Sequence, residues 1–129
     1  MRLLTGAVFA LAFCNAANSG QGPCGLEVGL WASSKAACQY ANNRREAAER
    51  FGQNVFLQLE AKAYQASEAR CSIRSARLNK KSCKLSVTCT SEKGKKEDSE
   101  VEFYIRKPDQ VMVNLVNLYE HCRMTNSGQ

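Results

Sequence analysis

Six of the chain's seven cysteines, those that follow the first 19 residues, are the residues best able to do chemistry, and two kinds of chemistry compete for them. A chain of 129 residues carries them at positions Cys24, Cys38, Cys71, Cys83, Cys89 and Cys122. A zinc site would need clustered cysteine and histidine ligands, yet the sequence has no C-x-x-C pair and a single histidine. An even set of cysteines in a small exported chain is typical of disulfides. The sequence therefore predicts three disulfides and no metal site.

Groups that could act as catalytic acid, base or nucleophile are few. His121 is the only histidine, and a Cys-His catalytic pair would require its neighbour Cys122 to be a free thiol. Glu27, Glu60 and Glu68 could supply a carboxylate pair, but nothing in their spacing brings them together. No G-x-S-x-G, phosphate-binding loop or H-E-x-x-H motif is present. We expect a non-enzymatic protein without a cofactor, and a small hydrolase is the less favoured alternative.

Basic residues form the other candidate site. Those expected on the outer face and tip of a hairpin are Arg70, Arg74, Lys80, Lys81 and Lys84, and the next loop adds Lys93, Lys95 and Lys96. Such a patch could bind lipid A phosphates, acidic glycans or nucleic acid. The alternative is a solvated hairpin whose lysines prevent edge pairing. No aromatic residue interleaves the hairpin's basic residues, so a stacking platform for single strands is not predicted.

The hairpin that would carry these residues spans positions 71–89, with a turn at 79–81. A turn there places residues whose numbers sum to 160 opposite each other. One face of the hairpin then carries mostly apolar side chains and cysteines. The inner pairs are Cys71 with Cys89, Ile73 with Val87, Ser75 with Leu85 and Arg77 with Cys83. The outer pairs are Ser72 with Thr88, Arg74 with Ser86 and Ala76 with Lys84. Opposed strand positions lie about 5 Å apart, within reach of a disulfide, so the register favours a Cys71–Cys89 bridge.

Other short segments complete the predicted fold. Alternating apolar residues predict strands at 26–31, 54–60, 63–65, 100–107 and 111–116, and a last strand or short helix at 118–124. A helical segment is expected at 35–51; at Asn42-Asn43 either this helix breaks or the segment consists of two short turns. Charged residues at 91–99 predict a solvated loop. Together these elements indicate a mainly β fold, a small antiparallel barrel or sandwich with one helical segment after the first strand.

The first 19 residues have the layout of a secretory signal peptide. Arg2 precedes an apolar run at 3–13, and small residues follow it. The run is too short to span a bilayer, and no other segment is long and apolar enough. A lipidated Cys14 is the rival interpretation, although Phe13 stands where lipoprotein signals usually have a small residue. We expect a periplasmic or secreted domain at 20–129, with a net charge of 17 − 12 = +5 once Arg2 is removed.

The order of several short motifs resembles a known group of proteins. The motifs are Gly29-Leu30-Trp31 followed by Cys38, Glu68 to Cys71 with Ser72-Ile73, Val87-Thr88-Cys89, and Tyr119 to Cys122. This order is similar to that of a loose group of small exported proteins of Gram-negative bacteria. The resemblance implies a small barrel, lipocalin-like at most, with Cys71 paired to Cys89 and Cys38 paired to Cys122. That would leave Cys24 for Cys83, and the group brings no assigned chemistry.

Together these features predict an exported binding module that presents a rigid barrel to a protein partner or an anionic surface. The alternative is an inhibitor of a host or rival enzyme, because small disulfide-rich scaffolds serve that use. An inhibitor of lysozyme would be expected to be acidic, since that enzyme is basic. The net charge of +5 therefore counts against that target.

Overall fold

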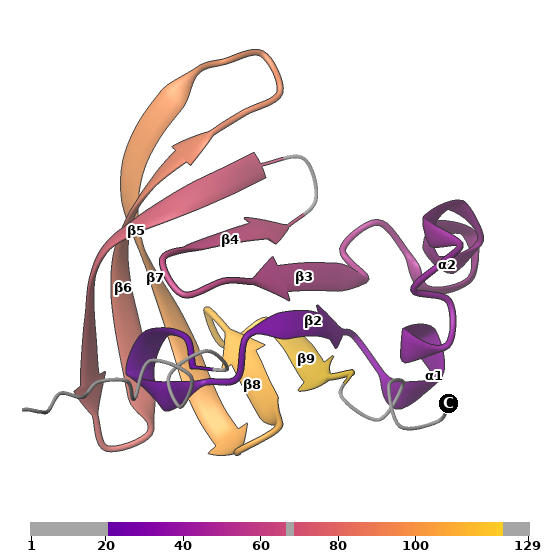
Figure 1. The fold of residues 1–129 in the computed structure, drawn as a ribbon, viewed down its shortest axis with the longest axis horizontal. Coiled ribbons are helices and arrows are strands. Elements are labelled where there is room, and N and C mark those ends of the chain that lie inside the picture. Colours follow the sequence, from indigo (N-terminus) through magenta and orange to yellow (C-terminus); the bar gives the residue numbers. More distant parts are fainter. Residues whose placement is uncertain (1–20, 67–68, 123–129) are drawn as a thin grey trace, which may run out of the picture.

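The protein is a closed antiparallel β-barrel of eight strands in the order β2-β3-β4-β5-β6-β7-β8-β9 (Figure 1). A computed structural model describes residues 21–66 and 69–122. The predicted signal peptide at 1–19, including Cys14, lies outside the described residues. The elements are η2 (Pro23–Gly25), β2 (Gly29–Ala32), α1 (Lys35–Cys38), α2 (Arg44–Phe51), β3 (Phe56–Leu59), β4 (Ala63–Ala66), β5 (Ala69–Asn79), β6 (Ser82–Thr90), β7 (Lys96–Lys107), β8 (Gln110–Val113) and β9 (Asn117–His121). The predicted mainly β barrel is confirmed.

All six cysteines of the described residues are paired. The two pairings implied by the resemblance are confirmed, and so is the Cys24–Cys83 pair that they leave. The bridges are Cys24–Cys83, Cys38–Cys122 and Cys71–Cys89. The first ties the 3-10 turn η2 to the start of β6, the second ties α1 to the residue after β9, and the third crosses the hairpin β5–β6. Each bridge therefore joins different elements of the barrel.

The predicted hairpin register holds only at the open end of β5–β6. Cys71 lies opposite Cys89, and Ile73 lies opposite Val87. A bulge between Ile73 and Ser75 then adds one residue to β5 and shifts every later pair by one position. Beyond it the partners are Ser75–Ser86, Ala76–Leu85, Arg77–Lys84 and Leu78–Cys83. The four predicted pairs that include Ser75, Arg77, Arg74 and Ala76 are wrong, and Arg77 is exposed on the outer face instead of lying inward.

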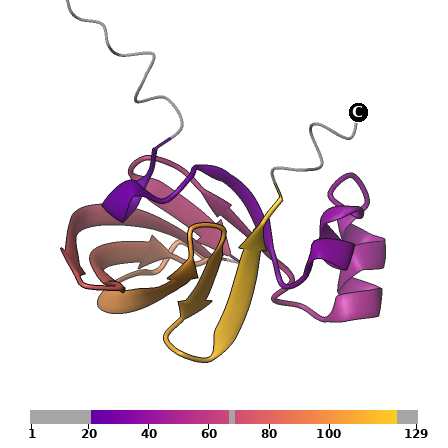
Figure 2. The same cartoon turned by 90° about the horizontal axis from the view of Figure 1, so that it is seen from below.

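The predicted helical segment is broken at the expected place. The Ser34 hydroxyl accepts a hydrogen bond from the Ala37 amide at the start of α1, and the Asn43 side chain caps α2 by accepting from the Glu46 amide at 3.1 Å. Gly52 ends α2 with a φ of 104°, a conformation that favours glycine. Both helices lie beside one end of the barrel, next to the ends of β2 and β3 (Figures 1 and 2).

Several predicted boundaries are wrong. The first strand begins at Gly29, because Leu26 caps η2 by donating its amide to Pro23 and Glu27 forms an isolated bridge with Gln21. The predicted loop at 91–99 shrinks to a turn, since β7 starts at Lys96 and pairs with the whole length of β6. Strand β8 ends at Val113, and a turn at 114–116 with two positive-φ residues follows it. The last element is a strand and not a helix.

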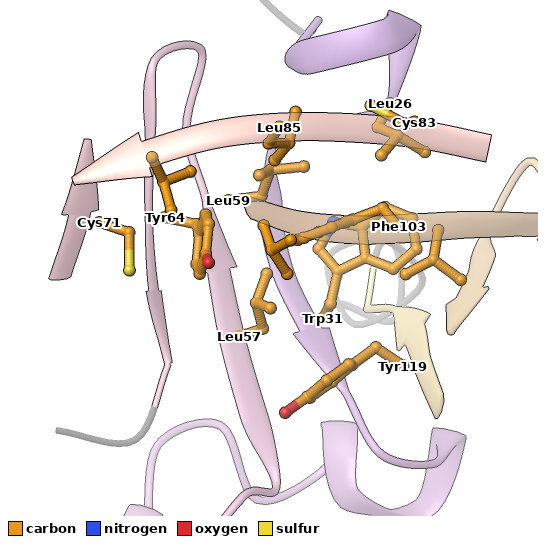
Figure 3. Packing of buried hydrophobic residues seen from close by; sticks show 13 residues of the cluster. Leu26, Trp31, Leu57, Leu59, Tyr64, Cys71, Cys83, Leu85, Phe103 and Tyr119 are labelled. Carbon is orange, nitrogen blue, oxygen red and sulfur yellow. The ribbon is translucent and has the colours of Figure 1, made fainter. Parts of the chain in front are cut away.

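Two hydrophobic clusters stabilise these elements. The barrel interior is filled by large side chains, among which Trp31, Phe103 and Leu85 are almost fully buried (Figure 3). A second cluster packs the helices against the outside of the barrel, and its members are Ala32, Ala37, Cys38, Ala47, Val55, Phe56 and Cys122. The Cys38–Cys122 bridge belongs to this second cluster, so it fixes the helical segment to the barrel.

Candidate functional site

The five basic residues predicted as one patch are spread along the hairpin. Arg70 lies at the end of β5 that pairs with β4, and Lys80 lies at the opposite end in the hairpin turn. Ten residues of extended strand separate them, a span of about 30 Å. The five residues therefore cannot contact one small ligand together.

Arg70 is engaged by a neighbouring carboxylate. Its Nη1 and Nη2 donate to Oε2 and Oε1 of Glu60 at 3.1 and 2.9 Å, a two-bond geometry that suits guanidinium and carboxylate groups. The hydrogen bond from Arg70 lowers the pKa of Glu60, and the same bond raises the pKa of Arg70. The charge of Arg70 is therefore largely compensated within the protein.

Arg74 has a local partner as well. It is the extra residue of the β5 bulge, and its Nη2 donates to the carbonyl oxygen of Val87 across the hairpin at 3.2 Å. This bond provides a donor for a backbone carbonyl next to the interrupted ladder. Arg74 therefore supports the bulge and is less available to a ligand than the basic residues at the turn.

The structure adds three basic residues to Lys80, Lys81 and Lys84: Arg77 from β5, and Arg106 and Lys107 from β7. The Ile105 amide donates to the carbonyl oxygen of Lys81 at 2.8 Å, so the end of β7 runs beside the turn. Arg106 and Lys107 follow Ile105 directly. We call the combined surface the basic tip, and it consists of Arg77, Lys80, Lys81, Lys84, Arg106 and Lys107. All six are exposed, and none makes an ion pair or side-chain hydrogen bond within the described residues.

One aromatic residue lies on the same outer surface. Tyr104 is opposite Ser82 in the β6–β7 ladder, and its neighbour Phe103 points into the core. Successive residues of a strand face opposite sides, so Tyr104 is on the outside with Lys84 and Arg106. Tyr104 and the hairpin lie far apart in the sequence, so the sequence did not predict that they are neighbours. A single partly buried tyrosine is still short of the row of aromatic rings that stacks successive bases.

The lysines of the β6–β7 turn do not belong to the basic tip. Lys93, Lys95 and Lys96 lie where β6 ends and β7 begins, which is the other end of these strands. In Figure 1 this turn projects away from the β5–β6 turn. Glu92, Glu97 and Asp98 intersperse with these three lysines in the sequence. Their local field is therefore mixed in sign, unlike that of the basic tip.

A shallow polar groove lies on another part of the outer surface. Its volume is about 320 Å³, and it runs between α2 and the outer side of β3 and β4. The guanidinium of Arg44 lies over the Phe56 ring, 4.8 Å from its centroid. Three glutamines also line the groove, namely Gln53, Gln58 and Gln65. A wider depression of about 700 Å³, lined by Arg70, Ser72 and Thr90 among others, adjoins it at Gln65.

The candidate catalytic residues are held in structural contacts. His121 is 6% exposed, and its Nε2 forms a hydrogen bond with the carbonyl oxygen of Val28 at 3.0 Å. Its Nδ1 is buried without a hydrogen-bond partner among the described residues. The carboxylate of Glu27 is 3.9 Å from Nε2, a proximity that the sequence did not predict. Neither of the two grooves is lined by His121.

Glu60 and Glu68, the other candidate carboxylates, give no catalytic pair. Glu60 binds Arg70 through both of its oxygens. Glu68 lies outside the described residues. In the part of the chain that the structure describes, no group of three or more His, Cys, Asp and Glu side chains could hold a metal ion. Across the same residues, no helix is long and apolar enough to cross a membrane.

The fold and its charged surface define a small, disulfide-bridged antiparallel barrel with a basic hairpin turn. No protein-family model matches the chain. Neither the curated proteins nor the solved structures include one that matches it.

Proposed function

We propose that the protein is an exported, non-enzymatic binding module, periplasmic or secreted, that presents its basic tip to an acidic protein or an anionic surface. One observation carries the proposal: the fold brings the six basic residues of the tip, Lys81 among them, from two chain segments to one end of the β5–β6 hairpin, and none of the six has an ion-pair partner within the described residues. Arg77, Lys80 and Lys84 come from the hairpin, and Arg106 and Lys107 come from β7. A concentration of like charge attracts anions over a distance set by the ionic strength.

Two disulfides and a long strand pairing hold the hairpin of the basic tip rigid, and a rigid surface favours binding. The Cys24–Cys83 bridge lies one residue from the start of β6, and Cys71–Cys89 crosses the same hairpin near its open end. Strand β6 also pairs with β7 over nine positions. A hairpin held in this way loses little conformational entropy on binding, so more of the interaction energy appears as affinity.

The proposed location rests on the cysteines and the first residues of the chain. Three disulfides in one small domain are typical of proteins that fold in an oxidising compartment. The sequence at 1–19 predicts a signal peptide, which agrees with that compartment. The resemblance to small exported proteins of Gram-negative bacteria supports the same location.

Retention on heparin tests the role of the basic tip. The triple variant Lys80→Glu, Lys81→Glu, Lys84→Glu is compared with Lys93→Glu, Lys95→Glu, Lys96→Glu, which makes the same change in net charge at the other end of the strands. We expect wild type and the second variant to elute at clearly higher salt than the first. Equal elution of the two triple variants would show that net charge alone governs retention and that the tip is no specific binding surface.

A further inference from the structure

Among the residues that the structure describes, half of β5 has no strand on one of its two sides. Strand β4 pairs only with the first residues of β5, from Ala66 opposite Ala69 to Ala63 opposite Ser72. The Ile73 amide then donates to the carbonyl oxygen of Lys62, and this is the last backbone bond on that side. Strand β5 continues to Asn79 and pairs there only with β6.

The register identifies the backbone groups that this arrangement leaves free. Asn79 and Ser82 close the two-residue hairpin turn, so their backbone groups bond to each other. Bonding alternates along an antiparallel pair, so Arg77 and Ser75 also bond to β6. The N–H and C=O groups of Ala76 and Leu78 therefore point away from β6. Within the described residues no other backbone group bonds to these two. We call residues Ala76 to Leu78 the free β5 edge.

The side chains at the free β5 edge define what a docked strand would need. Ala76 and Leu78 lie opposite the buried residues Leu85 and Cys83, so they are on the inner face. Leu78 is nevertheless 51% exposed, because no strand covers its flank. Arg77 points to the outer face with Lys84. A strand added here would place apolar residues beside Leu78 and acidic residues beside Arg77.

The opposite edge of the same hairpin already holds a strand of that kind. Strand β7 places Glu102 opposite Lys84 on the outer face, and it places Val101 and Phe103 opposite Leu85 and Cys83 on the inner face. Alternating acidic and apolar residues therefore pair with this hairpin inside the protein's own barrel. The free β5 edge offers a similar combination, with Ala76 and Leu78 on the inner face and Arg77 on the outer face.

A second copy of the chain fits the free β5 edge poorly. Antiparallel pairing of two β5 strands would bring Arg77 of one copy close to basic residues of the other. Like charges at an edge oppose such self-pairing. The same basic residues attract an acidic strand. They therefore determine which partner can bind, in addition to preventing pairing with a second copy.

We propose that the free β5 edge binds an extended acidic peptide segment, which adds a strand to the barrel through the backbone groups of Ala76 and Leu78. Its acidic side chains alternate with apolar ones, and the acidic ones lie along Arg77. That the partner is acidic rests on the function proposed above for the basic tip. The strand addition rests on the free backbone groups and is tested separately.

Fluorescence anisotropy with a short labelled peptide that alternates glutamate and valine tests this inference. A peptide that alternates lysine and valine is the charge control. Wild type is expected to bind the acidic peptide and not the basic one. Ala76→Pro removes an outward N–H without breaking the β5–β6 ladder, and we expect it to weaken peptide binding by about tenfold or more. Leu78→Asn keeps every backbone group and the net charge, and it should weaken binding because a polar side chain replaces the apolar contact.

The outcomes separate the two proposals. Ala76→Pro should keep the heparin retention of wild type, and its circular dichroism spectrum checks that it is folded; if it does not fold, Leu78→Asn carries the test. Equal binding of both peptides by wild type, no binding of the acidic peptide, or undiminished binding by both variants would overturn the strand addition while leaving the basic tip intact. Loss of tip-dependent heparin retention with edge-dependent peptide binding preserved would overturn the basic tip alone.

Discussion

Gly29 and His121 are packed so closely that a Cβ atom on Gly29 would lie 3.3 Å from Nε2 of His121. Gly29 also has a φ of 121°, a conformation that other residues rarely adopt. Trp31, two residues later in the same G-x-W motif, meets the His121 ring edge-on, with 5.0 Å between the ring centroids. The motif therefore functions as a packing unit around the one histidine of the described barrel.

Gly29→Ala should destabilise the protein by about 1–3 kcal/mol, because it combines backbone strain with a close contact at His121. Urea unfolding measures the effect. Gly94→Ala is the matched control, since Gly94 has a φ of 85° and a Cβ there would meet nothing within 4 Å. Its smaller cost should represent the strain alone, so equal costs for the two variants would contradict a steric role for His121.

The cysteines predicted much of the architecture because a disulfide limits how far apart two strands can lie. Cys71 and Cys89 placed the open end of the hairpin correctly. The bulge at Arg74 could not be predicted, since Arg74 and Ser75, where the register shifts, are both polar and exposed. The strand at 96–99 could not be predicted either, because both faces of β7 are exposed there and hydrophobic alternation is absent.

The residues that form the basic tip could also be predicted only in part from the sequence. Lys80 and Lys81 could be placed at a turn from local sequence alone. Arg106 and Lys107 join them only through the pairing of β7 with β6, a contact between distant chain segments. Local patterns cannot supply such a pairing, whereas the register of Ser82 opposite Tyr104 determines it. Sequence reasoning also grouped Arg70 with the tip, although it lies at the far end of β5.

The three disulfides should differ in how much they stabilise the fold. Cys38–Cys122 closes a chain segment of 84 residues, whereas Cys71–Cys89 closes one of 18. In the chain-entropy account, replacing both cysteines with alanine should cost about 4–5 kcal/mol for the first bridge and about 3 kcal/mol for the second. Urea unfolding of the two double variants measures both values. A larger cost for the shorter segment would contradict this account.

The pKa of Glu60 should depend on Arg70. The hydrogen bond from Arg70 lowers the pKa of Glu60, so the stabilisation it brings is present above the ordinary pKa of glutamate. It is lost as the pH falls through the lowered value. Carboxyl titration by NMR should show the pKa of Glu60 return to its ordinary range in Arg70→Gln. Arg44→Gln, a change of equal charge elsewhere, should leave it low; a low pKa in both variants would rule out Arg70 as the cause.

Two tyrosines should ionise late. Burial raises the pKa of Tyr64 and of Tyr119, whose hydroxyl also donates to the Asn54 carbonyl oxygen. The stability from keeping them neutral is present below the ordinary tyrosine pKa of about 10 and is lost as the pH rises through their raised values. Absorbance at alkaline pH should lose one late-ionising group in Tyr119→Phe. An unchanged late phase would mean that Tyr119 is accessible to water.

The Cys38–Cys122 bridge has a consequence for proteolysis. The turns between consecutive strands from β3 to β9 all lie between these two cysteines in the chain. A protease that cuts once in any of these turns would leave both fragments covalently joined. The nicked protein would then run as a single band without reductant, and only a reducing gel would show that the backbone had been cut.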